Sequence, residues 1–422
     1  MDVLLLGLFV TGLLFFSITS LILLHNRRHF LGLADLTEVH DPHQDQGQKE
    51  TPPLVSILIP ARNEERNLPR LLETLRQQDW PRMEIHILDD HSEDNTRIIA
   101  EEFRDRVNAA KELDKTADPG QSAIGMHVYV HSAKRKPDGW LGKNWACHQL
   151  AGHARGNLYV FLDADTWVGG DAVSSIVVAM EKFELDFATV WPHQVMDTLL
   201  EKSVVSTVYS TVAAYLPTLY SYRAPAWIPF PDLRQKVKPL FASACGQCMI
   251  FKKQTYHNTG GHESVKDQVV EDVMLAKKVV RSGKSMRMFH GTNRLWCRMY
   301  RNPSEIFNGF RKNFFAGFGY RFLPFLFAWL LHFAVYLLPV LVLAAALSCS
   351  SCPSLNPLLA GGFAALVAGA LLQRLCIAKF LKWPYSTALL YLPGILWFHM
   401  LAFVVIRDHL LQSGPSWKGR PV

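Results

Sequence analysis

The stretch Asn157-Leu-Tyr-Val-Phe-Leu-Asp-Ala-Asp-Thr-Trp167 joins an apolar run to two carboxylates. Leu158–Leu162 predicts a buried strand, because five consecutive apolar residues suit the interior of a sheet. Asp163 and Asp165 follow one residue apart, and residues i and i+2 point the same way on extended backbone. Two like charges placed there repel each other, and a divalent cation with a phosphate-bearing ligand would remove that cost. A loop with two solvated aspartates is the alternative interpretation.

The composition indicates a protein associated with membranes. The chain has 422 residues, of which 49% are hydrophobic and only 19% charged, and a formal net charge of +7. That charge suits anionic lipid or an anionic ligand. No Arg/Lys run with interleaved aromatics and no zinc-finger spacing occurs, so no nucleic-acid partner is predicted. Seven cysteines, an odd number, argue against a disulfide scaffold, and the Cys245/Cys248 and Cys349/Cys352 pairs flank a predicted span, which argues against a shared zinc site.

The N-terminal segment, residues 1–28, predicts a transmembrane anchor. Residues 2–24 form an apolar run of about the ~20 residues that a membrane helix requires. Arg27 and Arg28 follow, and basic residues prefer the cytoplasmic side, so the chain after them is expected in the cytoplasm. A cleaved signal peptide is the alternative, but there the basic residues precede the apolar run. Residues 29–53 are polar and predict a linker.

The C-terminal part, residues 322–410, predicts further transmembrane helices. Residues 322–348, about 355–372 and about 385–406 are apolar spans. The loop over residues 373–384 carries Arg374, Lys379 and Lys382 and is expected in the cytoplasm. These features predict a multi-pass protein of the cell (inner) membrane with its large polar domain in the cytoplasm. The tail, residues 411–422, conflicts with four spans because its basic residues prefer the inside, so its side stays open.

Residues 301–321 predict an amphipathic segment at the membrane interface. The stretch Phe310-Arg-Lys-Asn-Phe-Phe315 mixes aromatic and basic residues in the way that suits a helix lying in the headgroup region. A solvated helix before the next span is the alternative.

Residues 54–300 predict an α/β domain. Predicted strands at 54–59, 84–88, 126–130 and 158–162 alternate with helical patterns, which indicates a parallel sheet with helices on both faces. Ligands bind such sheets beyond the carboxyl ends of the strands. Polar residues cluster at those ends: Asn63, Glu64, Asp89, Asp90, Asp163 and Asp165. No Gly-x-Gly-x-x-Gly follows the first strand, which disfavours a dinucleotide oxidoreductase.

Five motifs in order resemble the membrane-attached family 2 glycosyltransferases with the GT-A fold. They are Ile59-Pro-Ala-Arg-Asn-Glu64, Leu88-Asp-Asp-His-Ser92, Gly139-Trp-Leu-Gly-Lys143, Asp163-Ala-Asp165 and Glu271-Asp272. The resemblance covers roughly residues 54–275. It implies a Rossmann-like mixed sheet between N-terminal and C-terminal transmembrane helices. The Trp-Leu-Gly-Lys-x-Trp-Ala stretch, the segment from Arg298 to Lys312 and the tail look like the bacterial subgroup associated with hopanoid and carotenoid-type lipids.

The resemblance implies a role for each matched residue. The nucleotide pocket would be shaped by Pro60, Ala61, Arg62 and Glu64. Asp89 or Asp90 would hydrogen-bond the base, taken to be uracil, and Lys143 would meet the diphosphate. Asp163 would touch the ribose or the metal, Asp165 would hold Mg²⁺ or Mn²⁺, and Asp272 would be the general base. His290 is a candidate third metal ligand. The acceptor side would include Gln247, Glu271, Arg298, Arg311 and Lys312.

The implied activity is an inverting transfer from a nucleotide-sugar, expected to be a UDP-sugar, to a hydroxyl or carboxyl group of a membrane lipid. Processive synthases of the family carry a Gln/Arg-x-x-Arg-Trp motif, whereas Arg298-Met-Tyr-Arg301 is followed here by Asn302. That departure favours a single transfer. A processive polysaccharide synthase and an inactive membrane scaffold or sugar-nucleotide sensor remain alternatives, and the sequence names neither the sugar, the lipid nor the oligomeric state.

Overall fold

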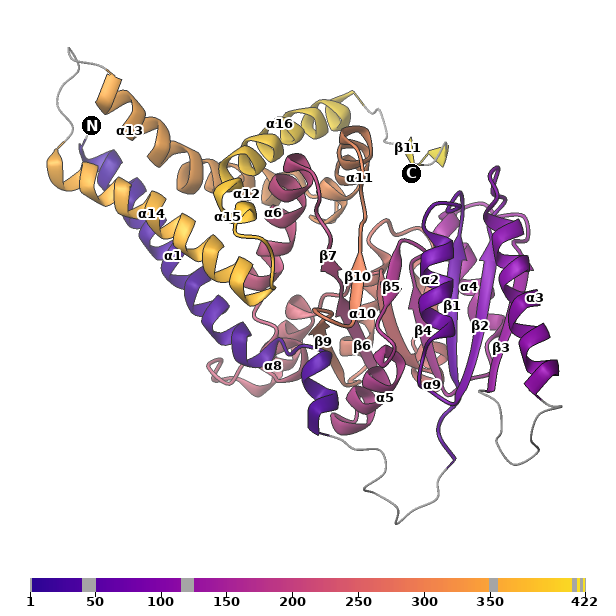
Figure 1. Cartoon of the computed structure of the whole chain (residues 1–422). Helices are drawn as coiled ribbons and strands as arrows, with labels where there is room; N and C mark the ends of the chain where they lie inside the picture. The colour runs from indigo at the N-terminus through magenta and orange to yellow at the C-terminus, as the bar shows by residue number, and fades with distance from the viewer. Residues whose placement is uncertain are drawn as a thin grey trace. The chain divides into compact units, whose positions relative to one another are not determined.

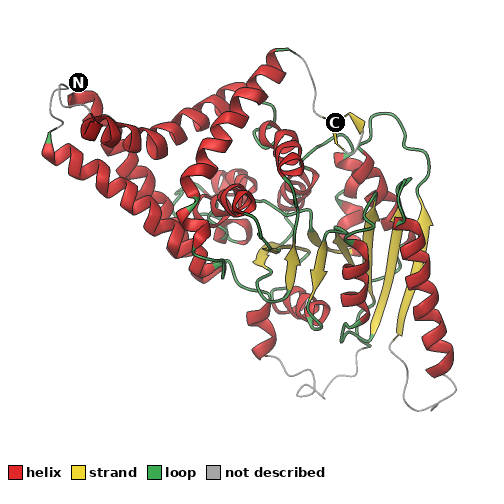
Figure 2. Ribbon diagram, turned by 45° about the horizontal axis from the view of Figure 1, so that its top comes forward, coloured by secondary structure: helices red, strands yellow, loops and turns green. Residues whose placement is uncertain are grey.

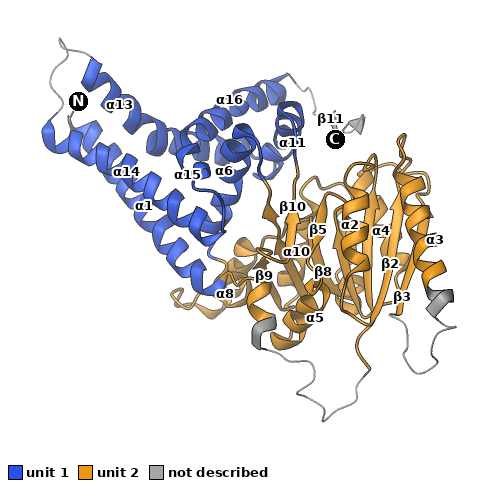
Figure 3. Ribbon diagram, viewed as in Figure 1, with its two compact units in different colours: residues 1–29, 196–217, 300–422 blue, residues 30–195, 218–299 orange. Residues whose placement is uncertain are grey.

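Two units make up the chain in this computed structural model (Figure 3). Unit 1 comprises residues 1–29, 196–217 and 300–422, and unit 2 comprises residues 30–195 and 218–299. The structure describes residues 2–39, 51–114, 125–348, 356–411, 416–417 and 420–421. Residues 40–50 of the predicted linker, the Cys349/Cys352 pair and much of the tail lie outside these ranges. The division assigns residues 196–217 to the unit of the apolar helices, although the sequence-based domain limits included them in the α/β domain.

Unit 2 is built on a seven-stranded sheet in the order β3-β2-β1-β4-β8-β6-β9 (Figure 1). The strands are β1 (Val55–Ala61), β2 (Arg82–Asp89), β3 (Gly125–Ser132), β4 (Leu158–Leu162), β6 (Phe187–Trp191), β8 (Cys248–Lys252) and β9 (Met286–His290). The first four run parallel, as the alternating pattern predicts. β8 is antiparallel to β4 and β6, so the complete sheet is mixed, which confirms the mixed sheet that the family resemblance implies.

The reversed strand β8 has a consequence for the carboxyl edge of the sheet. Leu162, the last residue of β4, lies opposite Cys248, the first residue of β8. The residues just before β8 therefore lie beside those just after β4. The backbone N–H of Asp163 donates to the carbonyl of Gln247 at 3.2 Å. The chain thus brings Gly246 and Gln247 to the edge where the parallel strands end.

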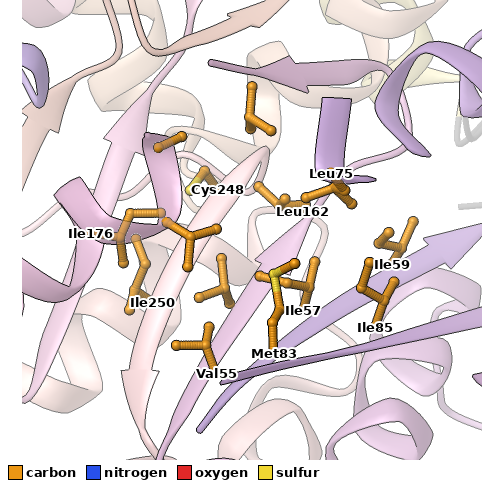
Figure 4. Close-up of a cluster of buried hydrophobic side chains, with 14 of the residues drawn as sticks. Val55, Ile57, Ile59, Leu75, Met83, Ile85, Leu162, Ile176, Cys248 and Ile250 are labelled. Carbon is orange, nitrogen blue, oxygen red and sulfur yellow. The ribbon is translucent and has the colours of Figure 1, made fainter. Parts of the chain in front are cut away.

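Helices cover both faces of this sheet (Figure 2). They include α2 (Leu68–Arg76), α3 (Thr96–Asp114), α4 (Gly142–His153), α5 (Ala172–Lys182), α9 (Lys253–Asn258) and α10 (Glu271–Arg281). Four leucines at i, i+3, i+4 and i+7 spacing, Leu68, Leu71, Leu72 and Leu75, form the buried face of α2. They join Ile57, Ile85 and Ile250 in one hydrophobic core (Figure 4). This core fixes the strands whose ends carry the candidate site.

A three-stranded sheet stands beside the main sheet, in the order β5-β10-β7. Its strands are β5 (Thr166–Val168), β10 (Leu295–Cys297) and β7 (His193–Gln194). Cys297 lies opposite Thr166 on one side and Gln194 on the other. Because β5 starts directly after Asp165, this pairing brings Cys297 next to the second aspartate of the Asp-x-Asp element.

The helical stretch that follows β7 is divided between the two units. In unit 1, α6 (Leu199–Tyr215) ends just before Pro217, and in unit 2 the chain continues as α7 (Leu219–Tyr222), α8 (Pro231–Val237) and the 3-10 helix η2 (Lys238–Phe241). Proline lacks the N–H that a continuing helix needs and restricts the residue before it, which accounts for the break.

The described residues of unit 1 include four helical segments long and apolar enough to cross a membrane: Val3–His29, Phe322–Ser348, Pro357–Phe380 and Tyr391–Leu410. They lie in α1 (Asp2–His29), the run α12 (Phe322–His332), η4 (Phe333–Leu337) and α13 (Leu338–Ser348), α14 (Pro357–Phe380) and α16 (Tyr391–Leu410). The predicted membrane helices at both ends of the chain are thereby confirmed.

The loop expected from residue 373 begins later than predicted, because α14 continues to Phe380. Two polar side chains find partners within the helical unit. Gln373 Nε2 donates to Thr19 Oγ1 at 2.9 Å and to Ser20 Oγ at 3.0 Å, and the Arg374 guanidinium lies 6.0 Å from the ring centroid of Tyr336. Polar residues are tolerated in apolar helices when other helices satisfy them.

Candidate active site

The ends of β1 and β2 form one wall of the candidate site. Ala61 lies opposite Asp89, and the N–H of Asp90 donates to the carbonyl of Ala61 at 2.8 Å. Arg62 Nη1 donates to the carbonyl of Asp90 at 3.0 Å. Asp89 and Asp90 are buried. Four predicted nucleotide-pocket residues, with Pro60 next to them, therefore meet at the carboxyl edge of two neighbouring strands.

The loops after β1 and β2 are tied to each other by hydrogen bonds. The N–H of Asn63 donates to Ser92 Oγ at 3.0 Å, and the N–H of Glu64 donates to Thr96 Oγ1 at 2.7 Å. Ser92 does not cap the following helix, because α3 begins four residues later at Thr96, whose N–H donates to Asp94 Oδ1 at 3.0 Å. The Ser92 hydroxyl instead joins the two loops and fixes the wall of the pocket.

The centre of the candidate site is a lysine held between two carboxylates. Lys143 Nζ lies 2.8 Å from Asp163 Oδ1 and 3.3 Å from Glu271 Oε1. Lys143 comes from the first turn of α4, Asp163 follows β4, and Glu271 opens α10. Burial would lower the pKa of Lys143, but the Asp163 and Glu271 carboxylates hold it well above its ordinary value. The ammonium is therefore a permanent positive charge among acids.

Asp272 completes the acidic cluster. Its Oδ2 accepts from the N–H of Gly246 at 2.8 Å, and its Oδ1 accepts from the N–H of Val273 at 2.7 Å. Burial, reinforced by the negative charge of Glu271, raises the pKa of Asp272 to about 7. A carboxyl group with that pKa exchanges a proton readily at neutral pH, as a general base must.

The backbone of Gly246 lies against three charged side chains of this cluster. A Cβ atom at position 246 would lie 3.1 Å from Lys143 Nζ and 3.3 Å from both Asp272 Oδ2 and Glu271 Oε1. Those distances are tighter than ordinary van der Waals contact, so only the absence of a side chain lets the charged groups approach the backbone this closely.

A relay of buried hydrogen bonds leads to Asp165. Gln194 Nε2 donates to Gln247 Oε1 at 3.1 Å, and Gln247 Nε2 donates to Cys297 Sγ at 2.8 Å. The Cys297 thiol in turn hydrogen-bonds the Asp165 carboxylate, and burial together with that negative charge raises the pKa of the thiol well above its ordinary value. The thiol therefore stays protonated and acts as a donor that orients the second aspartate of the pair.

The donor set suits a hard divalent cation bound jointly with a phosphate ligand. Mg²⁺ is commonly held by one or two carboxylates plus substrate phosphates, and Asp163 and Asp165 offer two carboxylates at the end of one strand. Among the described residues, no group of three His, Cys, Asp or Glu side chains forms a complete metal site. His290, the candidate third ligand, ends β9, where its N–H donates to the carbonyl of Leu31 and its ring lies against Phe30.

The predicted acceptor-side residues divide between the two units. Gln247 and Glu271 belong to the cluster just described, and Arg298 follows Cys297 in unit 2. Arg311 and Lys312 lie on α11 (Pro303–Ala316) of unit 1, where Arg311 Nε pairs with Asp408 Oδ2 at 2.6 Å. The aromatic residues of α11 pack against α12 and α16 within that unit. An acceptor role for Arg298, Arg311 and Lys312 stays a prediction.

Three residues of the site were not anticipated from the sequence. Gly246 had a weak signal, since it lies in the small-residue stretch before β8. Gln194 and Cys297 had none, because only the pairing of β10 with β5 and β7 brings them to Asp165.

The sheet and the acidic edge together define a GT-A type domain, the architecture of nucleotide-sugar-dependent transferases. Residues 56–116 and 132–260 match the family described as Glycosyl transferase family 2, and residues 238–295 match Glycosyl transferase family 21. The chain contains a glycosyltransferase family 2 domain, as the five motifs predicted.

Curated relatives are similar over most of this chain. It is 26% identical over 292 residues to the 4,4'-diaponeurosporenoate glycosyltransferase of Staphylococcus haemolyticus, covering 69% of this chain and 65% of that protein. It is 25% identical over 300 residues to the protein of the same name from Staphylococcus aureus, covering 70% and 67%. The match thus spans just under two thirds of the length of the first of these relatives.

Solved structures are similar at lower identity. The mannosyltransferase PcManGT from Pyrobaculum calidifontis, in complex with GDP-Man and Mn²⁺, is 17% identical with a TM-score of 0.48, over 96% of this chain and 99% of that one. Glucosyl-3-phosphoglycerate synthase from Mycobacterium tuberculosis is 16% identical with a TM-score of 0.39, over 64% and 80%.

Replacing Gly246 by alanine is expected to lower glycosyl transfer by roughly 10- to 100-fold, because displacement of reacting groups by a fraction of an ångström is costly. The matched control is Gly152→Ala on α4, where an added Cβ meets nothing within 4 Å. Both variants are compared by rate of transfer and by thermal unfolding of the full chain. Equal rates for the two alanine variants would contradict the proposed crowding at position 246.

Proposed function

We propose that this chain is an inverting glycosyltransferase that moves a sugar from a nucleotide-sugar, a UDP-sugar, to a hydroxyl or carboxyl group of a membrane lipid. The observation that carries the proposal is the cluster of Lys143, Asp163, Glu271 and Asp272, in which one permanent cation and one carboxyl group of near-neutral pKa meet at the carboxyl edge of the sheet. The family 2 domain supports the reaction class, and the four apolar helices support a membrane acceptor.

The donor would bind along the edge formed by β1, β2 and β4. Asp89 and Asp90 are buried carboxylates that suit hydrogen bonds to the base. The Arg62 guanidinium, which donates to the backbone carbonyl of Asp90, lies beside them. Asp163 and Asp165 would hold Mg²⁺ or Mn²⁺, which when bound neutralises the diphosphate and makes it a better leaving group. Lys143 adds a fixed positive charge beside Asp163 that favours the same diphosphate.

Asp272 would accept the proton of a hydroxyl acceptor as its oxygen attacks the anomeric carbon on the face opposite the leaving group. Its two backbone hydrogen bonds, from Gly246 and Val273, fix the orientation of the carboxylate. One displacement of this kind inverts the anomeric configuration. Holding both substrates in this arrangement would supply much of the remaining acceleration.

The acceptor class follows from the relatives and the apolar helices. The staphylococcal relatives are named for diaponeurosporenoate, a carboxylate by its ending, so a carotenoid-like lipid acid is the first acceptor to consider. Such an acceptor arrives already ionised and needs no general base, whereas a lipid alcohol does. The activity that an Asp272→Asn variant retains with each acceptor therefore separates the two acceptor classes.

The chain would be a multi-pass protein of the cell (inner) membrane with the family 2 domain in the cytoplasm. The first candidate span ends in Arg27, Arg28 and His29, and basic residues prefer the cytoplasmic side. Unit 2 follows directly at Phe30.

Asp272→Asn is expected to lower the rate of transfer to a lipid alcohol by about 10²- to 10⁴-fold, the usual contribution of a general base. The base acts when ionised, and its pKa is raised to about 7, so the parental rate should rise with pH up to about 7 and level off above it. The variant should lose that pH step. The measurement is the rate of UDP release and of glycolipid formation by the purified full chain with defined lipids.

The matched control is Asp267→Asn, an exposed carboxylate five residues earlier, which should keep the parental rate and pH profile. With a lipid acid as acceptor, Asp272→Asn should keep much of its activity. An Asp272→Asn enzyme that shows the parental rate and pH step with a lipid alcohol would rule out this carboxyl group as the base.

Chelation of divalent metal is expected to abolish transfer, and added Mg²⁺ or Mn²⁺ should restore it. Cys297→Ala removes the donor that orients Asp165, and groups that orient ligands typically contribute 10- to 100-fold in metal affinity or activity. The metal concentration for half-maximal transfer should therefore rise by roughly tenfold or more, and Cys297→Ser, which keeps a donor, should recover part of it.

The control for this series is Cys248→Ala, a buried thiol in the core of the sheet. It should lower the unfolding temperature without changing the metal requirement. If Cys248→Ala and Cys297→Ala shift the metal requirement equally, the relay to Asp165 has no specific role.

A further inference from the structure

Unit 2 exposes an unusual group of apolar side chains between α7 and β8. Four of them lie within 14 residues, and their exposed fractions are 67% for Trp227, 66% for Phe230, 44% for Leu233 and 69% for Leu240. Single exposed apolar residues are ordinary on protein surfaces, whereas a concentrated group marks an interaction site. We refer to residues 219–241, which hold this group, as the 219–241 segment.

Basic residues are interleaved with these apolar side chains. The segment contains Arg223, Arg234, Lys236 and Lys238, and its one acidic residue is Asp232. Aromatic and leucine side chains beside lysine and arginine are typical of surfaces that lie in the headgroup region of a bilayer. Basic residues near an anionic lipid surface are attracted to it by its negative potential.

The segment is packed onto the sheet of unit 2 at its start and its end. The Arg287 guanidinium of β9 lies 4.4 Å from the ring centroid of Tyr222. The rings of Tyr220 and Phe241 lie 5.1 Å apart and join the beginning of the segment to its end. Arg234 Nε donates to the carbonyl of Ile228, which ties α8 to the preceding loop. The exposed apolar residues therefore lie on a segment that is fixed to the sheet of unit 2.

Strand β9 also holds the chain where it leaves the first candidate span. That span ends at His29, and the carbonyl of Leu31 accepts from the N–H of His290, while the N–H of Leu33 donates to the carbonyl of His290. Arg287, which contacts the 219–241 segment, is three residues before His290, about 10 Å along the strand. The residues that follow the first candidate span in the chain and the segment thus both contact the same short strand of unit 2.

The chain that leads into the segment starts from the same end of the first span. In unit 1, Asn26 Nδ2 donates to the carbonyls of Ala213 and Leu216, both at 2.8 Å. Asn26 lies next to the basic residues that close the span. The segment begins at Leu219, three residues after Leu216, which spans about 11 Å at most.

We propose that the 219–241 segment is a second membrane contact of this protein, which binds the headgroup region of an anionic lipid bilayer. Trp227, Phe230, Leu233 and Leu240 enter the boundary between headgroups and acyl chains, while the four basic side chains meet lipid phosphates. The proposal rests on exposed apolar area, charge and attachment to the end of the first span. It holds whether or not the chain transfers sugars.

The test uses the full chain in lipid nanodiscs with a fluorophore on Phe230→Cys. Brominated lipids should quench this label strongly in discs that contain anionic lipid. The matched control is Ile98→Cys on α3, an exposed apolar position of the same unit with an exposed fraction of 55%, whose label should be quenched several-fold less. The unsubstituted chain, labelled in parallel, gives the background of native thiols, and Trp227→Cys provides a second position in the segment.

Charge reversal separates lipid binding from other occupants of the surface. Adding Arg223→Glu and Lys236→Glu should reduce the quenching at position 230 several-fold in anionic discs and leave the control label unchanged. Equal quenching at positions 230 and 98 overturns the proposal. Quenching at position 230 that changes neither with the charge reversal nor with the anionic lipid content also overturns it. Activity is not the readout, so these outcomes are independent of the proposed glycosyl transfer.

Discussion

The rest of the candidate site depends on the ion pairs that the Lys143 ammonium makes with Asp163 and Glu271. Two unit charges about 4 Å apart interact by roughly 4 kcal/mol at a dielectric constant of about 20, so carboxylates gathered as closely as Asp163 and Glu271 require a compensating cation. Lys143 supplies it from the first turn of α4. The position of α4, which contacts β1 and β2 and buries Ala146, Cys147 and Leu150, therefore determines whether the acids can share one edge.

Local patterns were enough to predict the parallel half of the sheet and the membrane helices. The leucine spacing of α2, the apolar runs of β1, β2 and β4 and the long apolar helices each carry their signal within a few turns or strands. The direction of β8 carries no such signal, because a short apolar run reads the same in either direction. Its antiparallel pairing follows from where the chain returns after α8, which is a long-range property.

The same distinction separates the predicted from the missed residues of the site. Lys143, Asp163, Glu271 and Asp272 belong to motifs of a known family, and the structure brings them within ion-pair or hydrogen-bond distance of one another or of Gly246. Gln194 and Cys297 belong to strands of two and three residues. Strands that short have no periodicity to read, so the relay that orients Asp165 becomes visible only through strand pairing.

The balance of charge links the protonation of Asp272 to a bound metal. With Asp163, Glu271 and Asp272 all ionised, the cluster carries three negative charges against the single positive charge of Lys143. Burial, together with the negative charge of Glu271, raises the pKa of Asp272 to about 7, and a proton on this carboxyl group relieves part of the imbalance. If Asp163 and Asp165 hold a divalent cation, as the proposed function requires, the cation would relieve the imbalance as well, and its binding would favour the ionised form of Asp272. The negative charges of the donor diphosphate would act in the opposite direction, so the protonation of the proposed base would depend on both the metal and the donor.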